Sequence, residues 1–292
     1  MSADQHRSER VVGEATLPAV RRFAGLTLDR VRLMGIVNVT PDSFSDGGET
    51  LATEAAVTRG LMMLDEGADI IDVGGESTRP GASPVTATEE IARIIPVVRA
   101  LAAAGALVSV DTRHPEVMRA AIAEGALIVN DITALRGEGA LALIAAAGVS
   151  VVLMHMQGEP RTMQSAPHYD DAAAEVCNWL AGRAAACVAA GIPAGHIAVD
   201  PGIGFGKTLA HNLAILAGLG RYRGLPHALL LGVSRKSFIS SLDRAVPAKQ
   251  RLGGSLAVAL ACVRDGAHIL RVHDVGDTRQ ALAVERALVG SR

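Results

Sequence analysis

The sequence predicts an α/β fold in a single domain, a (β/α)8 barrel of the TIM type. Short apolar runs rich in β-branched residues alternate with segments of helical periodicity, and this alternation occurs eight times. Repeated strand–helix units indicate parallel strands joined by crossover helices. Eight such units are the number that closes a barrel. A doubly wound open sheet is the alternative, because strand order cannot be read from a sequence.

The expected strands are short and rich in Val, Ile and Leu, as parallel strands covered on both faces are. They are Leu33–Val37, Asp69–Val73, Leu107–Val110, Leu127–Val129, Val149–Leu153, Ile197–Val199, Ala228–Val233 and Ile269–Val272. On this basis, residues 31–292 are assigned to the barrel. Residues 1–30 show weak periodicity and are assigned to an N-terminal extension.

Helices are expected between these strands. They are Thr53–Glu66, a segment after Thr86, Pro115–Glu124, Ala140–Ala147, Asp170–Ala190, Asn212–Leu219, Leu252–Asp265 and Thr278–Leu288. Thr86 and Glu89 have the spacing of a capping box, which marks a helix start. Pro96 is expected to kink that helix or to shorten one hydrogen-bonded turn.

Composition and charge argue against several classes of function. The formal net charge of −2 provides no basic field for nucleic acid or an anionic membrane. The cysteines form no C-x-x-C pair, and neither a zinc-ligand spacing nor a G-x-S-x-G elbow occurs, so zinc hydrolysis and serine chemistry are not expected. Residues 139–154 carry no charge, but Gly148 and Ser150 divide them into a helix and a strand. We therefore expect a cytoplasmic protein that acts on small molecules.

Polar or charged residues follow every expected strand at its C-terminal end. Barrels of this type place their active sites at that end, although an isolated residue there would be an ordinary loop cap. The residues are Asn38, Asp72, Glu76, Asp111, Asn130, Asp131, His155, Asp200, Ser234–Lys236, Arg271 and His273. We expect these side chains to form one polar mouth.

Arg271 and His273 predict an anion site. Two residues apart on one strand, they lie on the same face, and together they would suit phosphate or pyrophosphate. Asn38, on the neighbouring first strand, offers a hard amide oxygen for Mg²⁺. The alternative is that Arg271 pairs with Asp274 or another acid.

Asp111, Asn130 and Asp200 predict a site for a planar, nitrogen-rich ring. A carboxylate can bind the edge of an aminopyrimidine as it binds arginine, through two parallel hydrogen bonds. The alternative is a structural ion pair, for example between Asp111 and Arg113.

Lys236 lies at the start of a short helix expected at Phe238–Leu242, with Ser234 or Ser237 as its N-cap. A cation is unfavourable at the N-terminal end of a helix. This mismatch favours a binding role for Lys236 over a solvated surface position.

Two long loops after the first two strands, Asn38–Gly48 and Gly74–Ala82, are rich in Gly, Pro, Ser and Asp. We expect them to close over the mouth as lids. Ordinary surface turns are the alternative.

The segment VDPGIGFGKT at residues 199–208 looks like a phosphate-binding loop, but Pro201 stands where that loop requires glycine. Its place after the sixth strand favours contact with a flat ring, with glycines that let the backbone come close. Lys207, which suggested the phosphate loop, is the residue of this segment with the least support for a functional role.

Taken in order, VNVTPDSFSDGG, IDVGGESTRPGA, SVDT, NDI, LMHMQG, DPGIGFGK, SRKS and RVHD resemble the motifs of bacterial dihydropteroate synthases. The resemblance covers the chain from about Val31 onward. It implies a barrel, usually homodimeric, that joins 6-hydroxymethyl-7,8-dihydropterin diphosphate to para-aminobenzoate and releases pyrophosphate in folate synthesis. Sulfonamides, which mimic aminobenzoate, are then expected to compete.

The resemblance also implies roles for single residues. The pterin pocket would be formed by Asp111, Asn130, Asp200 and Lys236, and Met154 and Gly232 are further expected substrate-binding residues. Asn38 matches the Mg²⁺ ligand, and Arg271 and His273 match the diphosphate-binding residues. The lids and the aminobenzoate pocket would comprise Phe44, Thr78, Arg79, Pro80, Arg235, Lys236 and Ser237, with Phe205 as an apolar wall. Ile203 and Thr133 depart from the residues common in the family, but both changes are conservative.

Catalysis is assigned to Asp111, Lys236, Arg271 and His273. Arg271, His273 and Mg²⁺ would stabilise the departing diphosphate, and Asp111 would favour positive charge on the pterin methylene. One alternative is a methyltetrahydrofolate-binding methyltransferase domain, which has no reason to keep the two lids or the Arg-x-His pair. The other is a non-catalytic paralogue that binds pterin or a partner protein, and sequence alone does not exclude it.

Overall fold

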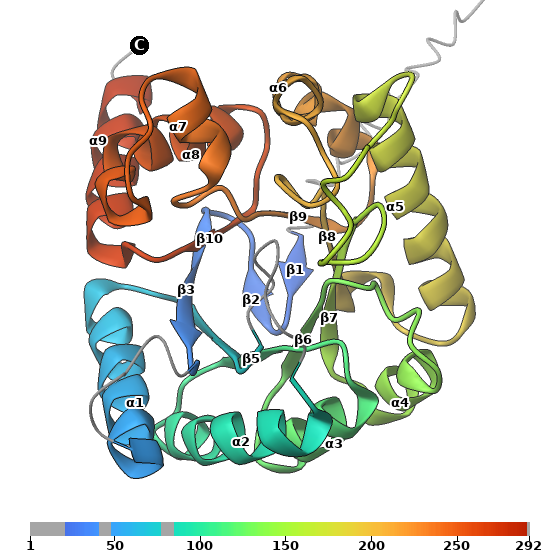
Figure 1. Cartoon of the computed structure of the whole chain (residues 1–292), viewed down its shortest axis with the longest axis vertical. Coiled ribbons are helices and arrows are strands. Elements are labelled where there is room, and N and C mark those ends of the chain that lie inside the picture. Colours follow the sequence, from blue (N-terminus) through green and yellow to red (C-terminus); the bar gives the residue numbers. More distant parts are fainter. Residues whose placement is uncertain (1–20, 41–47, 77–84, 291–292) are drawn as a thin grey trace, which may run out of the picture.

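A computed structural model of the chain describes residues 21–40, 48–76 and 85–290. Eight parallel strands close into a barrel in the order β10-β3-β4-β5-β6-β7-β8-β9 (Figure 1). The strands are β3 (Arg32–Asn38), β4 (Ile70–Gly74), β5 (Val108–Asp111), β6 (Ile128–Asp131), β7 (Ser150–Met154), β8 (Ile197–Asp200), β9 (Ala228–Leu231) and β10 (Ile269–Val272). Pairing of β10 with β3 closes the barrel, which confirms the predicted (β/α)8 fold and excludes the open sheet.

Helices surround the strands as an outer ring (Figure 1). They are α1 (Gly48–Glu66), α2 (Ala87–Ala103), α3 (Pro115–Ala123), α4 (Ala140–Ala147), α5 (Ala172–Ala189), α6 (Leu209–Ala217), α7 (Ser237–Leu242), α8 (Leu252–Arg264) and α9 (Val275–Gly290). The predicted capping box is present at the start of α2, where Thr86 and Glu89 bond reciprocally, and the helix continues through Pro96.

The barrel interior is layered, and this layering positions the site. Its lowest layer is apolar and includes Met34, Ile70, Ile128, Val152, Ala198 and Ile269. Because side chains alternate between the two faces of a strand, the residue two positions later on each strand points into the same interior. The residues reached in this way include Asp72, Asn130, Met154, Asp200 and Arg271. The apolar floor of the barrel therefore fixes which residues form its polar upper layer.

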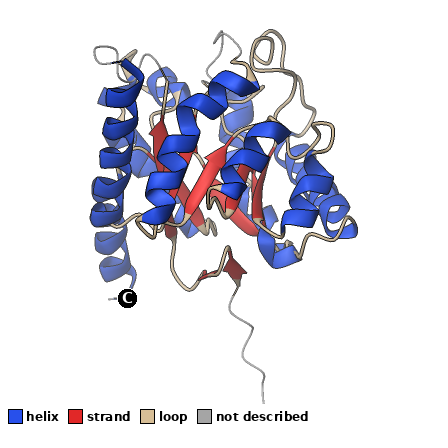
Figure 2. Cartoon of the chain, turned by 90° about the horizontal axis from the view of Figure 1, so that it is seen from below, coloured by secondary structure: helices blue, strands red, loops and turns tan. Residues whose placement is uncertain are grey.

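A two-stranded antiparallel sheet closes the bottom of the barrel (Figure 2). It consists of β1 (Arg22–Phe23) and β2 (Leu26–Thr27), joined by Ala24 and Gly25, which both have positive φ, as a type I′ hairpin turn requires. Phe23 is fully buried and belongs to the apolar floor. This hairpin lies in the segment assigned from sequence to the N-terminal extension.

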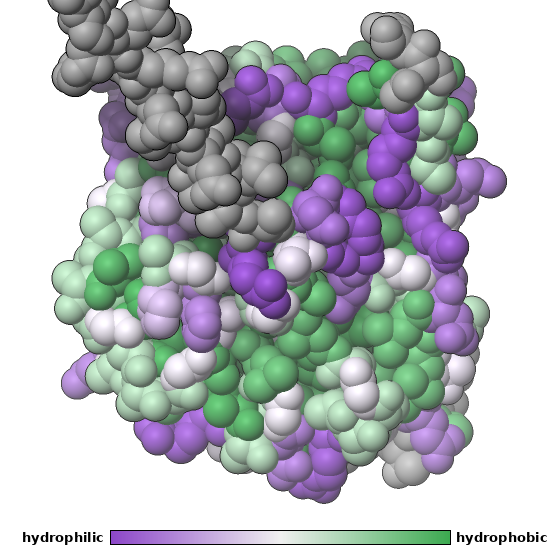
Figure 3. Space-filling model, turned by 180° about the vertical axis from the view of Figure 1, so that it is seen from behind, coloured by the Kyte–Doolittle hydropathy of each residue, from purple (hydrophilic) through white to green (hydrophobic). Residues whose placement is uncertain are grey.

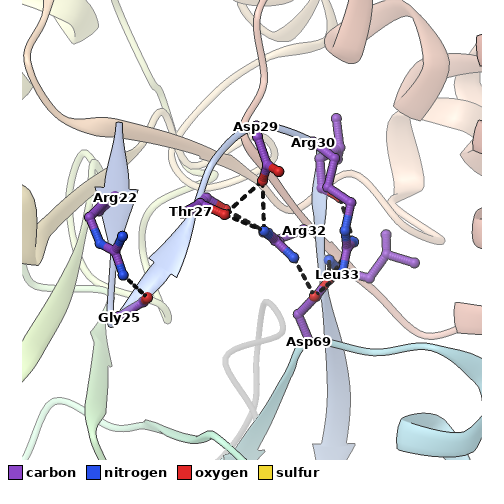
Figure 4. Close-up of polar contacts among 9 residues, drawn as sticks. Arg22, Gly25, Thr27, Asp29, Arg30, Arg32, Leu33 and Asp69 are labelled. Carbon is purple, nitrogen blue, oxygen red and sulfur yellow. Dashed lines mark hydrogen bonds and ion pairs between the residues drawn. The ribbon is translucent and has the colours of Figure 1, made fainter. Parts of the chain in front are cut away.

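A polar network ties the hairpin to the first barrel strands (Figure 4). Arg32 donates from Nε to the carbonyl of Thr27 at 2.7 Å and from Nη1 to Asp69 at 3.1 Å. The Asp69 carboxylate also accepts bonds from Arg30 and from the backbone N–H of Leu33. The hairpin is therefore held by directed contacts in addition to the burial of Phe23.

The face opposite the view of Figure 1 mixes hydrophilic and hydrophobic residues (Figure 3). In the part of the chain that the structure describes, no helix is both long and apolar enough to span a membrane.

Candidate active site

A cavity opens at the C-terminal ends of the strands, where the sequence predicts the polar mouth. Its lining comprises Asp111, Asn130, Ile132, Met154, Asp200, Gly202, Ile203, Phe205, Gly232, Lys236 and Arg271. Every residue that the family resemblance assigns to the pterin pocket is present, together with Phe205 and Arg271. Residues from six strands or their loops thus meet at one point, although they lie far apart in the sequence.

Two carboxylates hold Arg271 at the base of the cavity. Its Nε donates to Asp72 Oδ2 at 2.5 Å, and its Nη2 donates to Asp111 Oδ2 at 2.5 Å. Asp72 Oδ2 also accepts a bond from Asn130 Nδ2 at 3.1 Å. The alternative that Arg271 pairs with an acid is therefore observed, with Asp72 and Asp111 as the partners. Asp274 is not one of them, because it pairs with Arg235.

Asp111 does not form the structural ion pair considered for it. Arg113 instead pairs with Glu76 at 3.0 Å, beside the base of the second long loop. Burial raises the pKa of Asp111 to about 7; the positive charge of Arg271 opposes this rise, and the negative charge of Asp72 adds to it. Asp111 therefore titrates near neutral pH, although it contacts a guanidinium group.

Asp72 is a member of the site that the sequence did not single out. It was noted only as one of the polar strand ends, yet its side chain is fully buried and contacts both Arg271 and Asn130. Its Oδ1 atom has no hydrogen-bond partner among the described residues. Its position two residues after Ile70, whose side chain points into the barrel, indicates that the Asp72 side chain also points into the barrel.

Lys236 lies between the acids and the apolar wall of the cavity. Its Nζ is 4.3 Å from the centre of the Phe205 ring, which is the geometry of a cation–π contact. Burial lowers the pKa of Lys236 to about 8, although Asp200 favours the charged form. Burial likewise raises the pKa of Asp200, and its bond from the Gly202 N–H opposes that rise.

The loop that carries Lys236 differs from the prediction at its helix cap. The N-cap of α7 is Lys236 itself, with no side-chain capping bond, and Ser237 is the first helical residue. Arg235 has a φ of 58°, and its side chain pairs with Asp274 rather than lining the cavity. Ser237 is exposed and also lies outside the cavity lining.

Ser234 orients His273 instead of capping the helix. Its hydroxyl oxygen is 3.3 Å from the backbone nitrogen of His273 and 3.0 Å from the ring atom Nδ1. Burial lowers the pKa of His273 to about 3, helped by the charges of Arg235 and Arg271. The ring is therefore neutral at pH 7. When the Ser234 hydroxyl donates its proton to Nδ1, Nε2 carries the ring proton and can act as a donor.

The end of β3 places Asn38 one strand away from Arg271 and His273. Asn38 is half-buried and is not part of the cavity lining. Among the described residues, no cluster of three or more His, Cys, Asp or Glu could hold a metal ion.

The glycine loop after β8 packs closely against the backbone of His155 and Gln157. Gly202 and Gly206 have positive φ, and a Cβ on them would lie 2.1 Å from the carbonyl oxygen of His155 and 2.3 Å from that of Gln157. These distances explain why glycine is needed at both positions. The loop holds Phe205 at the cavity as an apolar wall.

Part of the predicted site lies outside the described residues. Phe44, Thr78, Arg79 and Pro80 belong to this part, as do most residues of the two expected lids. The base of the second lid is described: Glu76 accepts a bond from the backbone N–H of Val85 and pairs with Arg113.

The chain matches known proteins over nearly its whole length. The model of the family "Pterin binding enzyme" matches residues 34–273. Dihydropteroate synthase of Escherichia coli strain K12 is 49% identical over 268 residues, which cover 91% of this chain and 95% of that protein.

Solved structures agree with this match. A Xanthomonas albilineans dihydropteroate synthase with 4-aminobenzoic acid is 50% identical, with a TM-score of 0.87 and coverage of 92% of this chain and 98% of the other. The same organism's enzyme in complex with 7,8-dihydropteroate is 49% identical, with a TM-score of 0.83 and coverage of 90% and 95%. These findings confirm the predicted resemblance. The relatives described here are dihydropteroate synthases, and the chain belongs to the pterin-binding enzyme family.

Proposed function

We propose that this chain joins 6-hydroxymethyl-7,8-dihydropterin diphosphate to para-aminobenzoate, giving 7,8-dihydropteroate and pyrophosphate. The observation that carries the proposal is the convergence of Asp111, Asn130, Asp200, Lys236 and Arg271 on one cavity. These side chains suit a flat ring with several N–H and carbonyl groups along its edge. The relatives described above are named for this activity.

Within this proposal, the pterin ring lies in the cavity against Met154 and Gly232. Asp200 accepts bonds from the amino group and the adjacent ring N–H, and Asn130 supplies an amide. Lys236 donates to the ring carbonyl or to a ring nitrogen. The support is the position of each group in the cavity lining and the rule that buried polar groups require partners.

The diphosphate is assigned to Arg271 and His273. Arg271 uses Nε and Nη2 for Asp72 and Asp111, which leaves its Nη1 group for a diphosphate oxygen. His273 is assigned the tautomer in which Ser234 donates to Nδ1, so that Nε2 donates to the diphosphate. A neutral histidine can serve as this donor, so its low pKa does not oppose the role.

The donor set fits Mg²⁺ when the diphosphate supplies most of the ligands. Mg²⁺ commonly keeps several waters and takes one or two protein oxygens together with phosphate oxygens. Asn38 offers one amide oxygen beside the strand of Arg271 and His273. When bound, Mg²⁺ would neutralise charge on the leaving diphosphate.

The reaction breaks the bond between the pterin methylene carbon and the diphosphate oxygen. The electron pair leaves with the diphosphate, which Arg271 and His273 stabilise. The amine of aminobenzoate then forms the new C–N bond and loses one proton to solvent. Asp111, when ionised, favours the positive charge on the methylene, and Lys236 holds the ring in place.

Aminobenzoate is assigned to the outer side of the cavity, against Phe205. Phe44, Thr78, Arg79, Pro80, Arg235 and Ser237 are proposed to complete this pocket. Since Arg235 pairs with Asp274 in the structure, its role in the pocket requires either that this pair opens or that its backbone makes the contact. We also propose a cytoplasmic homodimer, as the family resemblance implies; sedimentation at several protein concentrations tests the dimer.

Pyrophosphate release tests the function. The chain is incubated with Mg²⁺ and the pterin diphosphate, with and without para-aminobenzoate, and pyrophosphate and dihydropteroate are both measured. Release that depends on aminobenzoate, and that a sulfonamide inhibits competitively with it, supports the proposal. If aminobenzoate adds nothing while the pterin still binds, the chain is a non-catalytic pterin-binding protein instead.

A further inference from the structure

Lys207 is a buried lysine that the proposed reaction does not use. It lies in the glycine loop between β8 and α6, its exposed fraction is 3%, and it does not line the cavity. Its Nζ is 2.9 Å from the carbonyl oxygen of Phe205, 3.0 Å from His155 Nδ1 and 3.2 Å from the carbonyl oxygen of His155. An ammonium group has three protons, and each has an acceptor here.

The His155 ring is uncharged, as a hydrogen bond from Lys207 to its Nδ1 requires. Burial lowers the pKa of His155 to about 3, helped by the charge of Lys207, so the ring is neutral and Nδ1 can accept. The ring packs edge-on against Trp179, with the centroids 5.0 Å apart. Burial also lowers the pKa of Lys207, to about 7, although Asp200 opposes this change.

Further contacts fix the rest of the glycine loop. Tyr169 donates its hydroxyl to the Gly206 carbonyl at 2.9 Å, and Gln164 donates to the Gly204 carbonyl at 2.7 Å. The Gly204 N–H donates to Asn212 at 2.7 Å. Lys207 differs from these residues because it holds the carbonyl of Phe205 itself, and it joins that carbonyl to the end of β7.

We propose that Lys207 is a positioning residue for aminobenzoate: by joining the Phe205 carbonyl to His155, it fixes the Phe205 ring as the wall of the aminobenzoate pocket. Lys236 Nζ lies over one face of that ring. Phe205 therefore contacts two lysines: Lys207 at its backbone carbonyl and Lys236 at its ring. This inference rests on the proposed function, because it concerns the second substrate of that reaction.

The first test is Lys207→Met, which keeps the length of the side chain and removes all its donors. We expect the KM for aminobenzoate to rise about tenfold, equivalent to about 1.4 kcal/mol of binding, with a change in kcat below about threefold. Lys249→Met is the matched control, because Lys249 is exposed and the chain has only one other lysine, Lys236. A role in folding alone would reduce the active fraction, lowering kcat at an unchanged KM, and would overturn the proposal.

A double-mutant cycle asks whether Lys207 acts through Phe205. In a Phe205→Ala background, Lys207→Met should add little to the KM for aminobenzoate, because the wall that it positions is gone. An equal rise in both backgrounds would show that Lys207 acts elsewhere. The turnover of the unmutated chain is measured first, so failure of the proposed function is distinguished from failure of this inference.

A measurement on the unmutated protein covers the case in which Lys207→Met does not fold. With lysine labelled at Cε, the three lysines give three resonances, and Lys236→Met and Lys249→Met identify two of them. We expect the Lys207 resonance to shift when aminobenzoate binds beside a pterin ligand, while that of Lys249 stays in place. A Lys207 resonance that does not respond to aminobenzoate would refute the inference.

Discussion

Replacement of Asp72 by asparagine tests the charge arrangement at the base of the cavity. Asp72 is fully buried and accepts bonds from Arg271 at 2.5 Å and from Asn130 at 3.1 Å. Asparagine keeps the shape of the side chain and can still accept the Arg271 bond through its oxygen. The substitution therefore removes one negative charge while changing the packing little.

The expected result is a shift of the acid limb of kcat/KM to lower pH. The pKa of Asp111 is about 7, raised first by burial and further by Asp72. In the proposed reaction, Asp111 must be ionised to favour the cationic pterin. Two carboxylates held by one guanidinium are on the order of 5 Å apart, so their repulsion at an effective dielectric constant of 20 is about 3 kcal/mol. This is about 2 pKa units as an upper bound. Screening by Arg271 reduces it, and we expect a shift of about 1 unit downward.

The assay is pyrophosphate release, with kcat/KM measured at pH values on both sides of 7. Asp65→Asn is the control, since Asp65 is exposed on α1 and its loss changes the net charge by the same amount. An acid limb that stays in place, or moves to higher pH, would refute the reasoning. So would an equal shift in the Asp65 variant, because the effect would then follow from net charge alone.

Three further predictions follow from the structure. Phe23→Ala should lower the free energy of unfolding by about 3–5 kcal/mol, because it removes a fully buried ring from the barrel floor; urea denaturation measures this, with Leu127→Ala, at a 54% exposed position, as the control. Asp111→Asn should lower kcat far more than it weakens diphosphate binding, and equal losses in kinetics and calorimetry would contradict its role. Gly202→Ala should destabilise the protein, because its Cβ would lie 2.1 Å from the His155 carbonyl oxygen; an unchanged melting temperature would contradict this.

The fold and the composition of the cavity could be predicted because both depend on short-range patterns. Strand periodicity gives the interior positions, and the barrel brings the C-terminal ends of the strands together. Asp111, Asn130 and Asp200 were found in this way. The partners of these side chains could not be predicted, since Arg271 contacts acids 160 and 199 positions away in the chain.

Local capping rules were also insufficient in two places. Ser234 and Ser237 are both good N-cap residues, yet the N-cap of α7 is Lys236, and Ser234 bonds to His273 on another strand. The hairpin at residues 22–27 is too short to give a clear periodic signal, and its importance lies in the single ring of Phe23. In both cases a tertiary contact decides the structure.

The hairpin has a consequence for traffic through the enzyme. Phe23 and its neighbours fill the floor of the barrel, and the site cavity lies at the opposite, C-terminal end of the strands. In the proposed reaction, both substrates and both products would pass through that end of the barrel. With the pterin in the deeper position that we propose, it would have to bind before aminobenzoate. Packing at the far end of the barrel would thus contribute to the order of binding, although Phe23 does not line the cavity.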